Sequence, residues 1–134
     1  MLLHTGVSSP ETGEPPFPEW FRVPAATARH VNAVRAAGGR VVAVGTTAVR
    51  AIETAAAGAT TVAAAEGFTE LVVDERRGVG VVDGLLTGWH APEATHLDLV
   101  RAIAGRALVE RCYAAAAAHG YLWHEFGDLN LLLP

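Results

Sequence analysis

The chain has 134 residues, enough for one compact domain, and carries a net charge of −4 at pH 7. Hydrophobic residues make up 51% of it and charged residues 18%, a balance that excludes a disordered chain. The negative charge also argues against a segment that grips RNA by itself, because such segments are usually basic.

The apolar runs of the sequence are too short to cross a bilayer. The first residues lack the basic end and the long apolar stretch of a signal peptide. We therefore expect a cytoplasmic protein that does not contact membranes. Cys112 is the only cysteine, so neither an internal disulfide nor a cysteine-based zinc site is expected.

Two parts of the chain differ in their local patterns. Residues 1–23 are rich in Gly, Pro and Glu and are predicted to be a loop-rich N-terminal segment. Residues 24–134 are predicted to form an α/β domain. Pro24 is a favourable first residue for a helix over 25–37, which the following glycine pair ends.

Strand and helix patterns alternate along the rest of the chain. The run 41–44 is continuously apolar, which is typical of a parallel strand buried on both faces, and a helix is predicted to follow it at 46–57. Further strands are predicted at 69–74, 85–87 and 121–126, and further helices at 95–104 and 107–119. This order predicts an α/β fold with a mainly parallel sheet flanked by helices in three layers.

Polar turns follow three of the predicted strands, at residues 45–47, 87–90 and 127–128. Reactive loops in parallel sheets lie at the carboxyl ends of the strands. We therefore expect these three turns to meet at one edge of the sheet.

The first turn leads directly into a predicted helix. The N–H groups of a first helical turn have no partner within the helix, and the helix dipole adds partial positive charge. Residues 46–47 add hydroxyl groups, and Arg50 can reach back to the same spot. This indicates a site for a phosphate or a carboxylate. The alternative is that Thr46 only caps the helix and that Arg50 pairs at the surface with Glu53 or Glu66.

The second turn carries Trp89 and His90, two residues before Pro92. Such a histidine can act as a general acid or base, or can bind a base or sugar. The tryptophan can stack on a purine. The alternative is a structural loop in which Trp89 fills the core and His90 binds a carbonyl.

Three further residues have two interpretations each. Asp128 follows a predicted strand, so it can bind ribose hydroxyls or act as a base, or can simply cap a turn. His4, beside Gly6, and Glu19 have the same ambiguity. The histidines on predicted helices, namely His30, His96 and His119, are expected at the surface. No metal-ligand spacing, P-loop or dinucleotide fingerprint occurs, so no metal site is predicted.

Four segments resemble, in this order, the motifs of one enzyme family. Residues 3–6 resemble L-H-x-G, and residues 40–53 are similar to R-V-I-A-V-G-T-T-S-V-R-x-L-E. Residues 82–92 resemble V-D-x-L-L-T-N-F-H-L-P, and residues 126–128 resemble the closing Y-G-D. Over nearly its whole length the chain therefore resembles the C-terminal part of the S-adenosylmethionine:tRNA ribosyltransferase-isomerases of queuosine biosynthesis.

The resemblance implies a reaction. Members of the family that it resembles transfer the ribosyl part of S-adenosylmethionine onto 7-aminomethyl-7-deazaguanine in tRNA and isomerise it. The reaction gives epoxyqueuosine-tRNA and releases adenine and methionine. A base must remove a proton from the carbon next to the sulfonium. No cofactor is implied beyond S-adenosylmethionine as co-substrate. The implied partners are S-adenosylmethionine, tRNA through the full-length protein, and a missing N-terminal and β-barrel region or another subunit.

Site residues carry over only at matching positions. The catalytic candidates are His4, Glu19, His90 and Asp128, with individual roles left open. The substrate-binding candidates are Gly6, Gly45, Thr46, Thr47, Arg50, Thr87 and Trp89. Together the turns are expected to enclose an adenosyl-sized hollow, with Arg50, His90 and Asp128 at its rim.

The sequence also departs from the family pattern. The family's M-H-S-E appears as residues 16–19, which keep the glutamate but not the histidine, and its L-L-T-N-F-H has Gly88 in place of asparagine. A lysine after H-L-P is replaced by Glu93, and a Ser-Tyr pair by residues 125–126. Family chains are much longer and contain an inserted β-barrel, so an inactive fragment without this barrel is expected. The alternative is a non-catalytic paralogue of the same fold that binds an adenosyl group or nucleotide.

Overall fold

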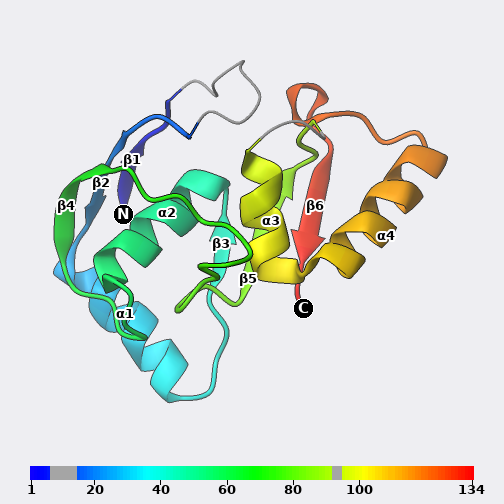
Figure 1. Cartoon of the computed structure of the whole chain (residues 1–134). Coiled ribbons are helices and arrows are strands. Elements are labelled where there is room, and N and C mark those ends of the chain that lie inside the picture. Colours follow the sequence, from blue (N-terminus) through cyan, green and yellow to red (C-terminus); the bar gives the residue numbers. More distant parts are fainter. Residues whose placement is uncertain (7–14, 92–94) are drawn as a thin grey trace.

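The computed structural model describes residues 1–6, 15–91 and 95–134, which form two small sheets and four α-helices (Figure 1). The strands are β1 (Leu2–His4), β2 (Glu19–Val23), β3 (Val42–Val44), β4 (Ala65–Thr69), β5 (Gly84–Gly88) and β6 (Leu129–Leu132). The helices are α1 (Ala25–Ala36), α2 (Thr46–Ala56), α3 (His96–Ala104), α4 (Arg106–Ala118) and the short 3₁₀ helix η1 (His124–Phe126).

The two sheets differ in strand direction. The first has the order β1-β2-β4, and both of its pairings are antiparallel. The second has the order β3-β5-β6, in which β3 and β5 are parallel while β6 runs antiparallel to β5. The α/β class is therefore confirmed. The mainly parallel sheet is wrong, because β3 and β5 form the one parallel pair among the strands described.

The predicted helices are confirmed, with ends that differ by one residue where they differ at all. The predicted strands at 41–44 and 85–87 are also confirmed as β3 and β5. The expected burial of the first of them on both faces is wrong, because Val42 and Val44 have exposed fractions of 41% and 70%. The strands predicted at 69–74 and 121–126 are wrong, since β4 ends at Thr69 and the last strand begins only at Leu129.

A side chain explains why no strand continues beyond Thr69. Arg50 Nε donates to Leu71 O at 2.9 Å, and Arg50 Nη2 donates to Thr69 O at 3.0 Å. These carbonyls thus bind a guanidinium instead of a neighbouring strand. Within the other range, residues 121–126, the short 3₁₀ helix η1 occupies the last three residues, so the backbone there is coiled rather than extended.

The predicted loop over residues 1–23 contains β1 and β2. In β2, Glu19, Phe21 and Val23 are buried, which is the alternation of a strand with one covered face. The strand pairs along its whole length with β4. The division of the chain between residues 23 and 24 stays a prediction.

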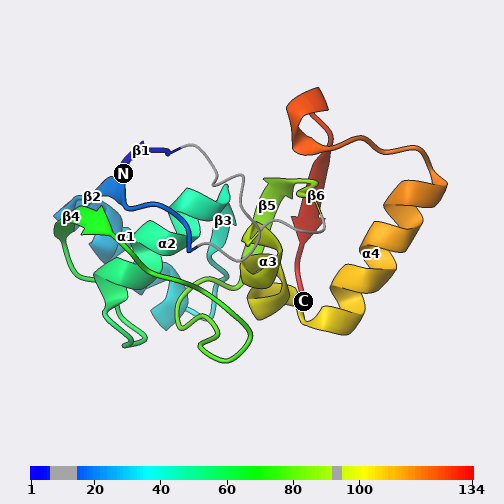
Figure 2. The same cartoon turned by 45° about the horizontal axis from the view of Figure 1, so that its top comes forward.

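Helix α2 forms the centre of the molecule. It packs against β2 and β4 on one side and against β3 on the other, so it lies between the two sheets (Figures 1 and 2). Its Val49 and Ala51 are completely buried, as is Leu85 of β5. Burial of this kind on more than one side is typical of a helix within a core rather than on a surface.

None of the helices in the described part of the chain combines the length and the hydropathy that a membrane span needs.

Candidate functional site

The three polar turns lie at one edge of the sheet β3-β5-β6. Gly45 N donates to Leu86 O at 2.9 Å, which joins the end of β3 to the end of β5. Gly88 pairs with Leu129, so Asp128 directly precedes the last pair of the ladder. Figure 1 shows the ends of β3 and β5 and the start of β6 on this side of the molecule. The backbone therefore brings the turns after β3 and β5 and the turn before β6 to the same end of the sheet, as expected.

Gly45 makes the turn from β3 into α2. Its φ of 85° lies in the left-handed region, where a side chain would be strained. Gly45 is the N-cap of α2, and no side chain caps the helix. The alternative in which Thr46 is the N-cap is therefore wrong, because Thr46 is already the first helical residue.

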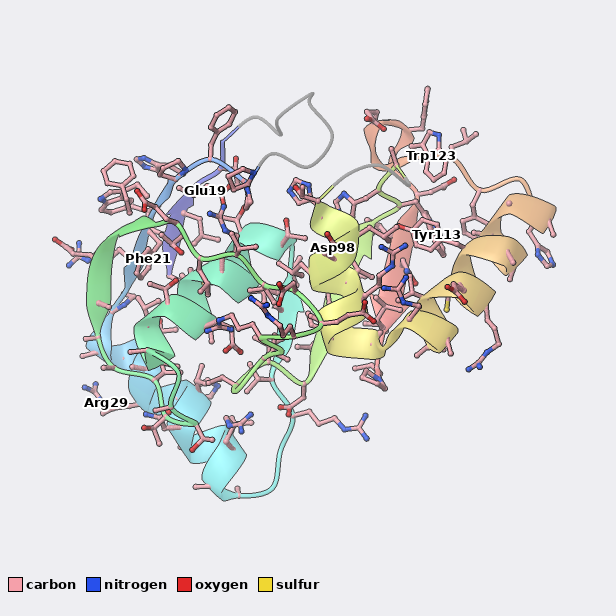
Figure 3. The ribbon with its side chains drawn as sticks, viewed as in Figure 1. Glu19, Phe21, Arg29, Asp98, Tyr113 and Trp123 are labelled. Atoms are coloured by element: carbon pink, nitrogen blue, oxygen red, sulfur yellow. The ribbon has the colours of Figure 1, made fainter. Side chains whose placement is uncertain are left out.

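The carboxylate of Glu19 lies beside the first turn of α2 (Figure 3). Its Oε1 accepts hydrogen bonds from Gly6 N at 3.1 Å and from Thr47 Oγ1 at 2.9 Å. Its Oε2 lies 2.5 Å from Arg50 Nη1. Glu19 and Arg50 are both buried, with exposed fractions of 8% and 4%.

Arg50 makes four hydrogen bonds to protein acceptors: Glu19, Phe17 O, Thr69 O and Leu71 O. The positive end of α2 therefore already faces an anion, which is the carboxylate of Glu19. Neither Glu53 nor Glu66 is the partner of Arg50, and the pair is not at the surface, so that alternative is wrong. The role of Arg50 in substrate binding stays a prediction.

Glu53 is a second buried carboxylate on α2, with an exposed fraction of 1%. It accepts backbone hydrogen bonds from Gly80 N at 2.9 Å, Val81 N at 2.9 Å and Val82 N at 3.1 Å. Arg77 Nη1 lies 3.8 Å from it. Glu53 thus fixes the segment that leads into β5, a role that sequence reasoning missed.

His90 is held on two sides. Its Nε2 lies 2.9 Å from Thr87 Oγ1, and both residues are buried. Its ring stacks on that of His96, with centroids 4.9 Å apart and planes at 11°. The expectation that His96 is a surface residue is therefore wrong, because this first residue of α3 is half-buried against the candidate site.

Trp89 lies within an aromatic cluster. Its ring meets Tyr113 edge-on, with centroids 4.9 Å apart, and meets Tyr121 at 5.9 Å. Trp89 has an exposed fraction of 6%, which fits the alternative in which it fills the core. Stacking of Trp89 on a purine stays a prediction.

Tyr113 of α4, which is labelled in Figure 3, connects this cluster to His90. Its hydroxyl accepts the His90 N–H and donates to His90 O, both at 3.2 Å. Burial raises the pKa of Tyr113 above its usual value of 10.0, although its bond to His90 and the charge of Arg101 oppose that rise. The hydroxyl therefore stays protonated at neutral pH and holds the backbone of the turn.

His4 and Asp128 lie apart from the group that Glu19 forms with Thr47 and Arg50. His4 pairs with Trp20 and its ring lies 4.9 Å from the Trp20 ring, so it shares the face of Trp20. Glu19 precedes Trp20 and points to the opposite face of the sheet. Asp128 Oδ2 accepts a hydrogen bond from Leu122 N at 2.6 Å, which closes its own loop. The catalytic roles of both residues stay predictions.

A hollow of about 240 Å³ lies between α2, the segment after β4 and the start of α3. Its polar lining comes from Arg50, Asp74, Thr95, His96 and Asp98. Its apolar lining comes from Pro15, Pro16, Leu71, Val72, Val73 and Leu99. Of the three residues expected at its rim, Arg50 lines this hollow, whereas His90 and Asp128 do not. His90 reaches it only through His96, on which its ring stacks. The described residues include no group of three or more His, Cys, Asp or Glu side chains that could hold a metal ion.

Comparisons with known proteins agree on one family. The model of the "Queuosine biosynthesis protein" family matches residues 2–132. The chain is 44% identical over 116 residues to the S-adenosylmethionine:tRNA ribosyltransferase-isomerase of Rhizorhabdus wittichii, which covers 87% of this chain and 34% of that protein. It is 46% identical over 141 residues to the enzyme of the same name from Acidithiobacillus ferrooxidans, which covers 100% of this chain and 41% of that protein.

A solved structure gives the same result. The S-adenosylmethionine tRNA ribosyltransferase of Thermotoga maritima superposes with a TM-score of 0.75 at 37% identity, over 86% of this chain and 41% of that chain. The present chain thus spans well under half the length of the relatives that it matches. The agreement of family model, relatives and solved structure establishes that the chain belongs to the queuosine biosynthesis protein family.

Proposed function

We propose that this chain supplies part of the S-adenosylmethionine site of a tRNA ribosyltransferase-isomerase. In the proposed reaction, the ribosyl part of S-adenosylmethionine moves to 7-aminomethyl-7-deazaguanine in tRNA and is isomerised, which gives epoxyqueuosine-tRNA. The observation that carries the proposal is the hollow beside α2, with Arg50 on one side and His96, stacked on His90, on the other.

The charges around the hollow suit the proposed substrate. S-adenosylmethionine carries a positive sulfonium and a positive amino group, and the carboxylates of Asp74 and Asp98 line the hollow. Opposite charges attract most strongly where little water separates them. The apolar part of the lining, which includes Leu71 and Leu99, suits the adenine and the methionine side chain.

His90 is our candidate for proton transfer at the carbon next to the sulfonium. Histidine changes its protonation near neutral pH, which general acid–base chemistry requires. Glu19 fits this role less well, because the charge of its carboxylate is paired with the buried guanidinium of Arg50, and uptake of a proton would leave that guanidinium unpaired. We assign Glu19 and Arg50 to the support of the hollow, next to the start of α2.

The chain alone is expected to be inactive. Its net charge of −4 is unfavourable for gripping tRNA, and it spans 34–41% of two relatives named for the complete reaction. The remaining part of such a polypeptide would supply contacts to the tRNA. The cytoplasm, where tRNA is modified, is the proposed location.

Adenine release tests this function. The chain is co-produced with the part of the A. ferrooxidans relative that it does not span, and the complex receives S-adenosylmethionine and tRNA carrying the deazaguanine precursor. We expect adenine to form with the complete mixture and not when either substrate, or the second polypeptide, is omitted.

A non-catalytic protein that binds an adenosyl group is the second candidate, favoured by the full use of the Arg50 guanidinium within the protein. Calorimetric titration of the complex with the second polypeptide, first with S-adenosylmethionine and then with tRNA, separates the two. Binding of S-adenosylmethionine without tRNA affinity and without adenine release would support the second candidate and refute the first.

A further inference from the structure

The two faces of the sheet β3-β5-β6 differ in burial. On the inner face, Ala43, Leu85 and Leu132 are opposite one another across the three strands, and their exposed fractions are 7%, 0% and 2%. Helices α2 and α3 pack on this sheet (Figure 2). The inner face is therefore part of the core.

The opposite face, which we call the outer face, is apolar, and the helices and strands of the described residues leave it uncovered. It consists of the side chains of Val42, Val44, Leu86, Leu129, Leu131 and Leu133. The exposed fraction is 70% for Val44, 59% for Leu129 and 56% for Leu131. Successive residues of a strand point to opposite faces, so this exposure repeats with the period of the strands.

The outer face is one continuous patch. Val44, Leu86 and Leu131 form a row across the three strands. Next to this row, a methyl group at Gly84 would lie 2.7 Å from Leu133 Cδ2 and 3.5 Å from Val42 Cγ2, so these two side chains approach each other over the glycine. Glycine is required there because a Cβ atom would also lie 2.9 Å from the backbone carbonyl oxygen of Leu132, which cannot move aside as a side chain can.

A patch of this kind requires a covering layer. A sheet with one face in water usually carries polar side chains on that face, whereas the outer face here carries valines and leucines. Large exposed apolar patches on soluble proteins mark surfaces that bind another apolar surface. The exposed face of the first sheet is mixed instead, because it carries Phe68 and Leu2 together with the ion pair of Arg22 and Glu66.

We propose that the outer face is the docking surface for the part of the family's polypeptide that this chain does not span, and that this part covers it with the apolar side of one or more helices. The chain matches 41% of the T. maritima structure with a TM-score of 0.75, so the majority of that polypeptide lies outside the shared fold. The relatives thus contain, outside the part shared with this chain, enough polypeptide to cover the apolar outer face. The inference rests on family membership, independently of the proposed reaction.

Thiol labelling tests this surface. In a Cys112→Ser background, Leu131→Cys places a single thiol on the outer face, and Phe68→Cys serves as the matched control. Phe68 lies on β4, and its exposed fraction of 70% equals that of Val44. In the chain alone, we expect both thiols to react rapidly with a maleimide.

Co-production with the remaining part of the A. ferrooxidans relative should slow labelling at position 131 by about tenfold or more, while position 68 keeps its rate. The same pair of cysteines at the aligned positions of the complete relative, freed of its own cysteines, gives the result in one polypeptide. Rapid labelling at the position aligned with Leu131 in that relative would overturn the proposal.

A charge on the outer face gives a second readout. Val44→Asp with Leu131→Asp should abolish co-purification with the second polypeptide, whereas Phe68→Asp should leave it unchanged. A second copy of this chain is the competing occupant. Protection of position 131 that depends only on the concentration of this chain, with no effect of the second polypeptide, would identify a homodimer and refute the proposed partner. Loss of adenine release with intact protection would count against the reaction alone.

Discussion

Arg50 Nη1 lies 2.5 Å from Glu19 Oε2, in a buried ion pair that joins the first turn of α2 to strand β2. The pair connects residues 31 positions apart in the sequence. The remaining bonds of Arg50 hold three backbone carbonyls, so one guanidinium organises β2, the end of β4 and the wall of the candidate site.

Replacing Glu19 by Ala should destabilise the chain strongly. The change leaves the Arg50 charge buried without its carboxylate, and loss of one partner of a buried pair costs about 3–5 kcal/mol. Urea unfolding followed by circular dichroism measures this free energy. Glu66→Ala is the control, since it breaks an exposed pair with Arg22 and should change the free energy of unfolding by no more than about 1 kcal/mol. Similar losses in the two variants would contradict the role assigned to Glu19.

Glu53→Gln should loosen the segment before β5. The amide nitrogen of glutamine is a donor, so it cannot accept all three backbone N–H groups that Glu53 now binds, and a buried unsatisfied group costs about 1–3 kcal/mol. Hydrogen exchange at residues 80–82 should become faster than in the unsubstituted chain. Glu110→Gln, at an exposed position on α4, should leave these exchange rates unchanged.

Tyr113 should make stability depend on alkaline pH. Burial raises the pKa of Tyr113 in the folded chain above the value of 10.0 that applies to the unfolded chain. Above pH 10.0, Tyr113 loses its proton in the unfolded chain but keeps it in the folded chain. The free energy of unfolding therefore falls as the pH rises toward the pKa of the folded chain. Below pH 10.0 both states are protonated, and this contribution does not vary.

The matching variant is Tyr113→Phe, which keeps the ring beside Trp89 and removes the hydroxyl. Urea unfolding of both chains at about pH 8 and about pH 10.5 should give a larger alkaline loss for the unsubstituted chain. The variant should also lose about 1 kcal/mol at neutral pH, because the His90 backbone loses its partner. Equal alkaline losses in both chains would exclude Tyr113 as the titrating group.

His90→Gln should abolish most of the proposed adenine release in the assembled protein. General acid–base catalysis contributes about 10²–10⁴-fold to a rate, and the loss should fall in that range. Affinity for S-adenosylmethionine, measured by calorimetry, should change much less than the rate. His30→Gln, on the exposed surface of α1, should retain full activity. A His90 variant with an undiminished rate would remove this residue from the chemistry.

The sequence predicts well those features that local patterns determine. The apolar run before Gly45 and the helix after it carry clear periodicities, and both form as β3 and α2. Strand β2 was hidden because Pro15, Pro16 and Pro18 precede it and lead to the interpretation of a loop. In β4, Glu66 and Gly67 are poor strand formers, and pairing with β2 determines the conformation instead.

The candidate site depends more on tertiary contacts. The alternation of strands and helices predicts that the polar turns lie at one end of the sheet β3-β5-β6. It does not predict that Glu19 rather than Glu53 is the partner of Arg50. Both glutamates are buried, and only their places in the fold assign one to a guanidinium and the other to backbone N–H groups. The stacking of His96 on His90 likewise has no periodic signal in the sequence, although only five residues separate the two.

The central position of α2 makes the two sheets mutually dependent for folding. Each sheet covers a different side of the same buried helix, so melting either one would expose apolar side chains that the other cannot cover. Intermediate states with one intact sheet are therefore costly, and the chain should unfold in a single cooperative transition. For the same reason, neither sheet is expected to persist when the polypeptide is cut on one side of α2.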